Sequence, residues 1–264
     1  MKIMQNINEF ISYKVLSFRK NRFSSEIEDS ICSLVDSKNV QEGIRKIVRQ
    51  VNKDGFFMLD GALSADTLAL LKVEYDGFFD MEDSRYCQVD RHDGAVLLRV
   101  MPFFGLDVVN DFPHTSAFFN SVHFKKIAEF FYKVNIRSIN YMFEVFIHNT
   151  VETKDPLSGG LHWDRWQTLK FWVYLNDIEI ENGPMRIVRG SSKKQSKIRR
   201  SSGDPSQLRG QIDNLVLEDD DDDVVYLTGS GGSILIQDTD ASHGSTVVLK
   251  DKERKIFRGH CRLK

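Results

Sequence analysis

Three residues of the chain have side chains that bind metals, at a spacing that suits a single ion. His162 and Asp164 stand two positions apart, and His243 follows much later in the chain. In an extended strand, residues two apart project to the same face, so this imidazole and this carboxylate can reach one point in space. Two histidines and one carboxylate form the facial triad of non-haem Fe(II) oxygenases, which leaves coordination positions open for an organic ligand and dioxygen. The three residues therefore predict an iron site.

The histidine-aspartate pair by itself is weak evidence, because any His-x-Asp sequence in a strand fits the pattern. One alternative stays open at this point: the three residues are ordinary polar side chains of a non-catalytic β-sandwich binding protein. The remaining histidines have no partner at ligand spacing, and we interpret them as structural or surface residues: His92, His114, His123, His148 and His260.

Two residues in the last part of the chain suit a dicarboxylate co-substrate. Arg254 lies at the head of the last predicted strand, where a buried guanidinium would hold the distal carboxylate by a bidentate ion pair. Ser245 could donate its hydroxyl to the same carboxylate. The alternative for Arg254 is a solvent-exposed charge, since it belongs to the charged run 250–255. A cupin-like metal enzyme that uses no keto acid would not need this arginine.

Hydrophobic periodicity predicts the elements that must position these residues. The first 54 residues have a helical pattern, in which Asn39 could cap a helix. A short apolar run at 56–59 has the length of a strand. A second helix is predicted to start at Ser64, and a third to cover about 115–132. The N-terminal part of the chain is therefore mainly helical.

The second half of the chain has a different pattern. Seven short β-prone runs alternate with turn signals, which is typical of a β-sandwich or barrel, and the leading helices would pack on its outside. Without an internal repeat or a long linker, we expect a single domain over residues 1–264, with residues 1–54 as a helical extension. The predicted strands are 139–147, 167–175, 185–188, 224–227, 233–236, 246–249 and 255–261.

Composition excludes several classes of protein. Hydrophobic residues make up 41% and charged residues 28% of the chain, which argues against disorder. The net charge of -2 provides no basic field for nucleic acid, and no apolar run is long enough to cross a membrane. Three widely spaced cysteines form no CxxC motif and no disulfide framework, so we expect a cytoplasmic protein without a signal peptide.

Two charged segments stand outside this framework. The basic segment 193–209 has the composition of a long loop, and it is either a solvated loop or a lid over an anionic substrate. The five aspartates at 219–223 directly precede a predicted strand, and we interpret them as a solvated loop that protects a sheet edge. The basic segment thus permits an anionic small-molecule partner.

Several segments resemble the phytanoyl-CoA dioxygenase-like (PhyH) branch of the 2-oxoglutarate/Fe(II) oxygenases, in the order that the family has them. The resemblance spans roughly residues 55 to 258, and the combination is far more specific than the His-x-Asp pair alone. The matching segments are Gly55-Phe56-Phe57-Met58-Leu59 with Leu63-Ser64, Leu161-His162-Trp163-Asp164, Trp172 to Asp177, Glu181 to Ser191, and Gly232 to Ile236 with His243-Gly244-Ser245.

The resemblance implies a fold and a set of site residues. The fold would be α+β with a mainly β core: a double-stranded β-helix (jelly roll, cupin-like) over residues 55–264, with N-terminal helices packed outside. Fe(II) would be bound by the two histidines and the aspartate, and 2-oxoglutarate would be held by Arg254 and Ser245. Two further cofactor contacts are implied, a tryptophan beside the co-substrate and a basic residue: Trp172 and Arg99.

The resemblance also implies an activity. The protein would be a non-haem Fe(II)- and 2-oxoglutarate-dependent dioxygenase that hydroxylates, or otherwise oxidises, a C–H bond of a small molecule with release of succinate and CO2. Related halogenases replace the acidic ligand with a small residue, so Asp164 favours hydroxylation or another oxidation. The alternatives remain a cupin-like metalloenzyme that does not use 2-oxoglutarate, and a non-catalytic β-sandwich binding protein.

Overall fold

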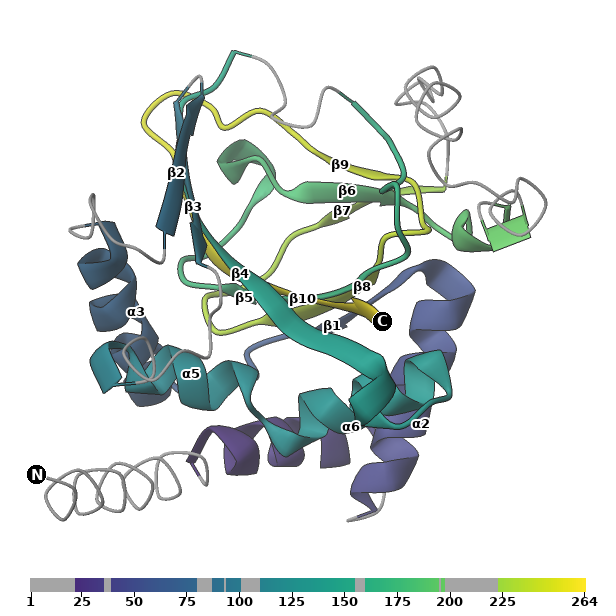
Figure 1. The fold of residues 1–264 in the computed structure, drawn as a ribbon. Coiled ribbons are helices and arrows are strands. Elements are labelled where there is room, and N and C mark those ends of the chain that lie inside the picture. The colour runs from purple at the N-terminus through teal and green to yellow at the C-terminus, as the bar shows by residue number, and fades with distance from the viewer. Residues whose placement is uncertain are drawn as a thin grey trace, which may run out of the picture.

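The framework of the molecule is a pair of antiparallel β-sheets with helices against one of them (Figure 1). Most of the basic segment 193–209, the aspartates 219–222 and the side chain of Arg99 lie outside the described residues. The computed structural model describes residues 22–35, 39–79, 87–92, 94–100, 110–154, 160–194, 196–197 and 223–264.

The larger sheet has seven strands in the order β1-β8-β5-β10-β4-β3-β2, and the smaller has three in the order β7-β6-β9. Neighbouring strands pair antiparallel throughout both sheets. The strands are β1 (Phe56–Leu59), β2 (Cys87–His92), β3 (Ala95–Val100), β4 (Ile139–Val151), β5 (Leu169–Tyr174), β6 (Met185–Val188), β7 (Val224–Leu227), β8 (Ile234–Asp238), β9 (His243–Ser245) and β10 (Glu253–Leu263).

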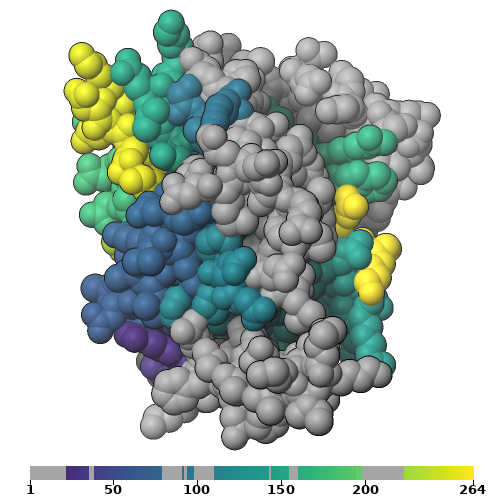
Figure 2. All heavy atoms as spheres, turned by 60° about the vertical axis from the view of Figure 1, so that its left-hand side comes forward, coloured from purple at the N-terminus to yellow at the C-terminus, as the bar shows by residue number. Residues whose placement is uncertain are grey.

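Helices cover the outer face of the larger sheet (Figure 1), and Figure 2 shows the blue surface of α3 beside the teal surface of α5. Their apolar faces form one core with this sheet, in which Phe124 of α6 stacks on Phe171 of β5 at 4.7 Å between ring centroids. The helices are α2 (Val40–Asp54), α3 (Ala65–Phe79), α5 (Pro113–Phe119) and α6 (Val122–Tyr132), with a helical stretch at 22–32 and 3-10 turns at Ile136–Ser138 and Ile180–Asn182.

The junction between α2 and β1 follows from two residues. The Asn39 side chain accepts hydrogen bonds from the backbone N–H groups of Gln41 and Glu42, which confirms the predicted cap. Gly55 ends the helix in the left-handed region, with φ 92. This turn sends the chain directly into β1, which pairs with β8.

A second core cluster joins the two sheets face to face. It combines apolar side chains from both sheets, and the sheets also line a common cavity, described below. The cluster contains Trp172, Tyr174, Ile178, Met185, Ile187, Leu227, Leu235, Ala241 and Ile256.

The predicted class, helices outside a mainly β core, is confirmed, but four elements differ. The predicted strand 246–249 is wrong: its backbone N–H groups bond to scattered partners, among them Pro184 and Glu181, and strand β9 stands just before it. The predicted helix 115–132 is two helices, because Ser121 is extended and caps the second. The strands β2 and β3 were not predicted. None of the helices in the described ranges is long and apolar enough to span a membrane.

Candidate metal centre

The backbone places His162 beside His243, which lies on β9, an edge strand of the smaller sheet. His162 and His243 form an antiparallel bridge in which each backbone N–H donates to the other residue's carbonyl at 2.8 Å. Directly opposed residues project to the same face, and the two imidazole rings lie 4.7 Å apart between centroids. β9 is itself held by β6, where Ile187 pairs with His243.

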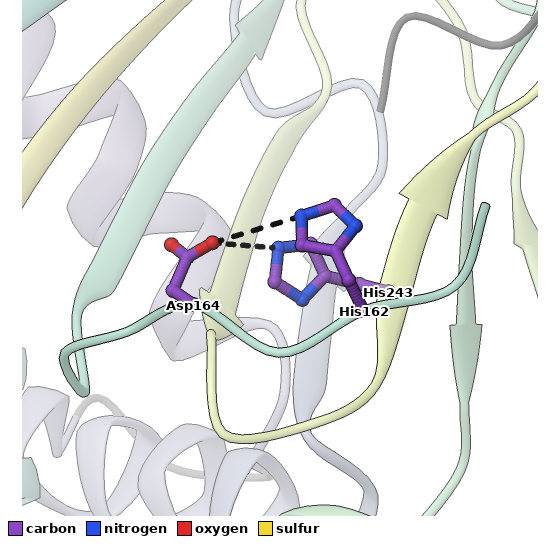
Figure 3. Close-up of side chains that lie close together, drawn as sticks. All are labelled: His162, Asp164 and His243. Atoms are coloured by element: carbon purple, nitrogen blue, oxygen red, sulfur yellow. Dashed lines mark ion pairs between the residues drawn. The ribbon is translucent and has the colours of Figure 1, made fainter. Parts of the chain in front are cut away.

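Asp164 completes the cluster. Its Oδ1 lies 3.8 Å from Nε2 of His162 and 3.6 Å from Nε2 of His243 (Figure 3). One ligand atom from each of the three residues lies within 4.8 Å of the others. Three side chains from two distant segments therefore converge on one point.

Hydrogen bonds and burial set the ligands' protonation. Nδ1 of His162 lies 3.1 Å from the Gly160 carbonyl and Nδ1 of His243 lies 2.8 Å from the Ala241 carbonyl, so Nδ1 donates and the Nε2 lone pair is available. Burial lowers the pKa of His243 to about 3, which keeps this ring neutral.

Asp164 is ionised. Burial opposes its ionisation, but the Lys170 ammonium, 2.7 Å from Oδ2, outweighs it and holds the pKa of the carboxyl well below its ordinary value. Metal ligands must be deprotonated, as this carboxylate and the neutral His243 imidazole are. Two imidazole nitrogens and one carboxylate on one side of a site fit Fe(II), with positions left open on the other side.

The cluster lies in the wall of a cavity of about 470 Å³ between the two sheets. This volume falls within the ordinary range for small-molecule sites. The described residues that line the cavity are Ala95, Leu97, His148, His162, Asp164, Lys170, Trp172, Met185, His243, Ser245, Arg254, Arg258 and His260.

Arg254 is a buried residue of this wall, and the solvent-exposed alternative is excluded. Its side chain is 3% exposed and donates to the Gly183 carbonyl, while its Nε has no hydrogen-bond partner in the described part of the chain. Burial lowers the pKa of Arg254 to about 10, which leaves the guanidinium charged at neutral pH. Ser245, also buried, lines the cavity from the opposite sheet, two residues after His243.

The two remaining predicted residues differ in what the structure shows. Trp172 lies in the cavity wall, where its indole N–H donates to Oε1 of Gln237 at 3.1 Å. The backbone of Arg99 is in β3, opposite Phe146 of β4, but its side chain lies outside the described residues.

Four polar residues of the wall were not predicted as site residues: His148, Lys170, Arg258 and His260. The two histidines were interpreted as structural or surface residues, and both are buried in the cavity wall. Strand alternation could have identified Arg258 and His260 as site residues. Both lie on the same face of β10 as Arg254, which was already predicted to line the site. The same rule places Lys170 beside Trp172 on β5.

The chain is similar in fold to solved structures that contain 2-oxoglutarate. The epimerase SnoN from nogalamycin biosynthesis, solved with Fe3+, alpha ketoglutarate and nogalamycin RO, has a TM-score of 0.58 and 14% identity over 84% of each chain. EctD from S. alaskensis, with 2-oxoglutarate and 5-hydroxyectoine, has a TM-score of 0.55 and 15% identity over 83% of this chain and 77% of its own. HygX from Streptomyces hygroscopicus, with nickel and 2-oxoglutarate, has a TM-score of 0.56 and 12% identity over 83% and 87%.

At this low identity the likeness concerns the fold, which is the double-stranded β-helix expected from the sequence. No curated protein matches the sequence. Residues 148–256 match the family model described as Phytanoyl-CoA dioxygenase (PhyH). The matched segment carries His162, Asp164 and His243, the three residues that could hold a metal ion, so this part of the chain is similar to the PhyH family in sequence as well as in fold.

Proposed function

We propose that the protein hydroxylates a C–H bond of a small molecule. Bound Fe(II) and 2-oxoglutarate would supply the oxidation: a substrate R–H, 2-oxoglutarate and O2 give R–OH, succinate and CO2, with one oxygen atom in the hydroxyl group and one in succinate. The observation that carries the proposal is the convergence of His162, Asp164 and His243 within 4.8 Å in the wall of the cavity between the two sheets.

In this proposal the two imidazoles and the carboxylate hold the metal from one side. The backbone bridge between His162 and His243 fixes both rings, and the carbonyls of Gly160 and Ala241 fix their tautomers. The three side chains therefore already lie together before the metal binds, so the site is preformed.

Arg254 and Ser245 would bind the distal carboxylate of 2-oxoglutarate. The support is a charged guanidinium that is buried, lines the cavity, and has an Nε without a hydrogen-bond partner in the described chain. Burying such a charge is costly unless an anion or other partners satisfy it. A cupin-like enzyme that uses no keto acid gives no reason for this arginine. Trp172 would form part of the same wall.

The substrate would carry an anionic group. Among the described lining residues, Lys170, Arg254 and Arg258 are cations, whereas Asp164 is the one carboxylate. Arg258 lines the cavity with its guanidinium over the rings of Phe146 and Trp172, and its charge adds to the positive potential that would attract an anionic group. The small organic molecules in the SnoN and EctD structures support a small-molecule substrate here as well.

Turnover assays test this function. Fe(II), 2-oxoglutarate and O2 should give succinate, and a screen of carboxylate substrates should raise its rate. In the absence of O2, Fe(II) with 2-oxoglutarate should give a visible charge-transfer band that Asp164→Ala abolishes. Arg254→Met should raise the 2-oxoglutarate concentration at half-saturation at least tenfold while metal binding persists, because a buried bidentate pair is lost.

The two alternatives give other results. O2 consumption with bound metal but no succinate would indicate a metal enzyme that does not use 2-oxoglutarate. No metal binding, and no effect of Asp164→Ala, would indicate a non-catalytic binding protein.

A further inference from the structure

Lys170 is the only buried lysine among the residues that the structure describes. It is the second residue of β5, 5% exposed, and it lines the cavity on the same face as Trp172. Strand register places it between Gln237 of β8 and His260 of β10. Its side chain therefore emerges from the middle of the larger sheet, toward the side chains of the metal cluster.

The Lys170 ammonium distinguishes between the two oxygens of Asp164. Nζ lies 2.7 Å from Oδ2, whereas Oδ1 is the oxygen that faces both imidazoles, at 3.8 Å and 3.6 Å from their Nε2 atoms. Figure 3 shows the carboxylate in this orientation, with one oxygen toward the two rings and the other turned away. The ammonium therefore holds the carboxylate at Oδ2, while Oδ1 is left facing the two Nε2 atoms.

Burying a lysine side chain at this position lowers the stability of the fold unless the charge has a partner. Neighbouring inward positions of β5 hold Trp172 and Tyr174, which belong to the apolar cluster between the sheets. Burial lowers the pKa of Lys170, and Asp164 opposes that shift. Replacing a buried ion pair with packed apolar residues is often neutral or stabilising, so the pair is poorly explained by stability. The effect of the ion pair on the orientation of the Asp164 carboxylate explains it better.

We propose that Lys170 is a positioning residue that holds Oδ2 of Asp164, so that the carboxylate binds the metal through Oδ1 alone. Carboxylates bind metals through one oxygen or through both. Binding through both would occupy a further position, and 2-oxoglutarate needs two adjacent ones. Lys170 would thus keep open the position that the co-substrate takes. This inference rests on the proposed function, because it assigns Lys170 a part in co-substrate binding.

The experiment compares Lys170→Met, which removes the donor at similar length, with Lys170→Arg, which keeps a charged donor. Binding of 2-oxoglutarate is measured without turnover, on Mn(II)-loaded protein and by the anaerobic Fe(II) charge-transfer band. At saturating metal, Lys170→Met should still bind the ion but bind 2-oxoglutarate about 10–100-fold more weakly, a loss of the size that removing the partner of a metal ligand causes in metal affinity or activity. The charge-transfer band of Lys170→Met at saturating metal should be weaker or shifted in wavelength. Lys170→Arg should recover most of the wild-type 2-oxoglutarate affinity and most of the wild-type band.

A matched control separates this role from stability. Arg189→Met breaks another ion pair to a buried carboxylate, that of Asp54 at 2.8 Å, and neither residue lines the cavity. It should leave 2-oxoglutarate affinity within twofold of the wild type. If Lys170→Met behaves like Arg189→Met, the pair is structural and the proposal is overturned. If wild-type protein itself gives no band, the proposed function fails first, which is a distinct outcome.

Discussion

At the scale of single residues, His148 shows how strongly the cavity's charges act on one group. Its side chain is buried on β4, and its Nε2 has no hydrogen-bond partner in the described chain. Burial, together with the cations Arg258, Arg254 and Lys170, holds the pKa of His148 well below its ordinary value. The ring therefore stays neutral in the folded protein under conditions that protonate a free histidine.

This depressed pKa makes stability depend on pH in a defined direction. As pH falls through about 6.5, the unfolded chain takes up a proton at this histidine and the folded protein does not, so stability falls with pH. Each pH unit below that point costs up to about 1.4 kcal/mol per such group. In His148→Leu the metal-free protein should lose less stability between pH 7.5 and pH 5.5 than the wild type, measured by urea unfolding.

The control for His148→Leu is Met185→Leu, a change in the same cavity wall that removes no titrating group. It should leave the pH dependence as in the wild type, where His243, with its pKa lowered to about 3, contributes in the same direction. An unchanged pH dependence in His148→Leu would mean that the folded protein protonates this ring, contrary to its position among three cations.

At the scale of elements, the join between α2 and β1 depends on Gly55. Any other residue at this position would need a left-handed backbone φ of 92. Its Cβ would also clash with Cβ of Ala241, which lies just before the strand that carries His243. Left-handed strain costs about 1–3 kcal/mol and overpacking about as much again. Gly55→Ala should therefore lower the free energy of unfolding by roughly 2–5 kcal/mol, measured by urea or thermal unfolding.

Gly61→Ala separates the two costs. This glycine also has a positive φ, 57, but the nearest atom to an added Cβ is Oγ of Ser230 at 3.8 Å. Gly61→Ala should therefore lower the free energy of unfolding by about 1 kcal/mol, from backbone strain alone. Equal losses in the two variants would show that the segment around Ala241 yields to the added methyl group.

Elements also show how much the sequence could predict. Periodicity found α2, α3 and most strands of the β core, because their apolar faces pack in one layer each. It failed at 246–249, where an apolar run is bonded to several loops rather than to one strand. It also missed β2, whose Cys-Gln-Val-Asp-Arg-His sequence has few apolar residues. Local pattern cannot show partners that are distant in the chain.

The same limit applies to the site. The cluster of His162, Asp164 and His243 was predictable because strand alternation and residue chemistry are local properties. The neighbours of the ligands depend on strand order: Lys170 reaches Asp164 only because β5 lies between β8 and β10 in the sheet. Arg254 could not be assigned to the interior from its charged flanks, and only the fold shows that it is buried.

At the scale of the whole molecule, the candidate site joins the two sheets. His243 and Ser245 belong to the smaller sheet, whereas Lys170 and Arg254 belong to the larger one. A metal with 2-oxoglutarate, bound as proposed, would contact both sheets and would stabilise their packing. Because ligand binding to the folded state alone adds stability by mass action, the effect can be measured without turnover.

Mn(II) and 2-oxoglutarate together, each at about 100 times its dissociation constant, should add at least about 2.7 kcal/mol and raise Tm by roughly 5–10 °C. Hydrogen exchange should slow in β6 and β9 as well as in β10, because the bound pair links the strands of both sheets. His243→Ala should show neither effect, while 2-oxoglutarate without metal should give little shift in the wild type. Protection confined to one sheet, or equal stabilisation of His243→Ala, would mean that the ligands bind elsewhere and that the two sheets are not bridged at this cavity.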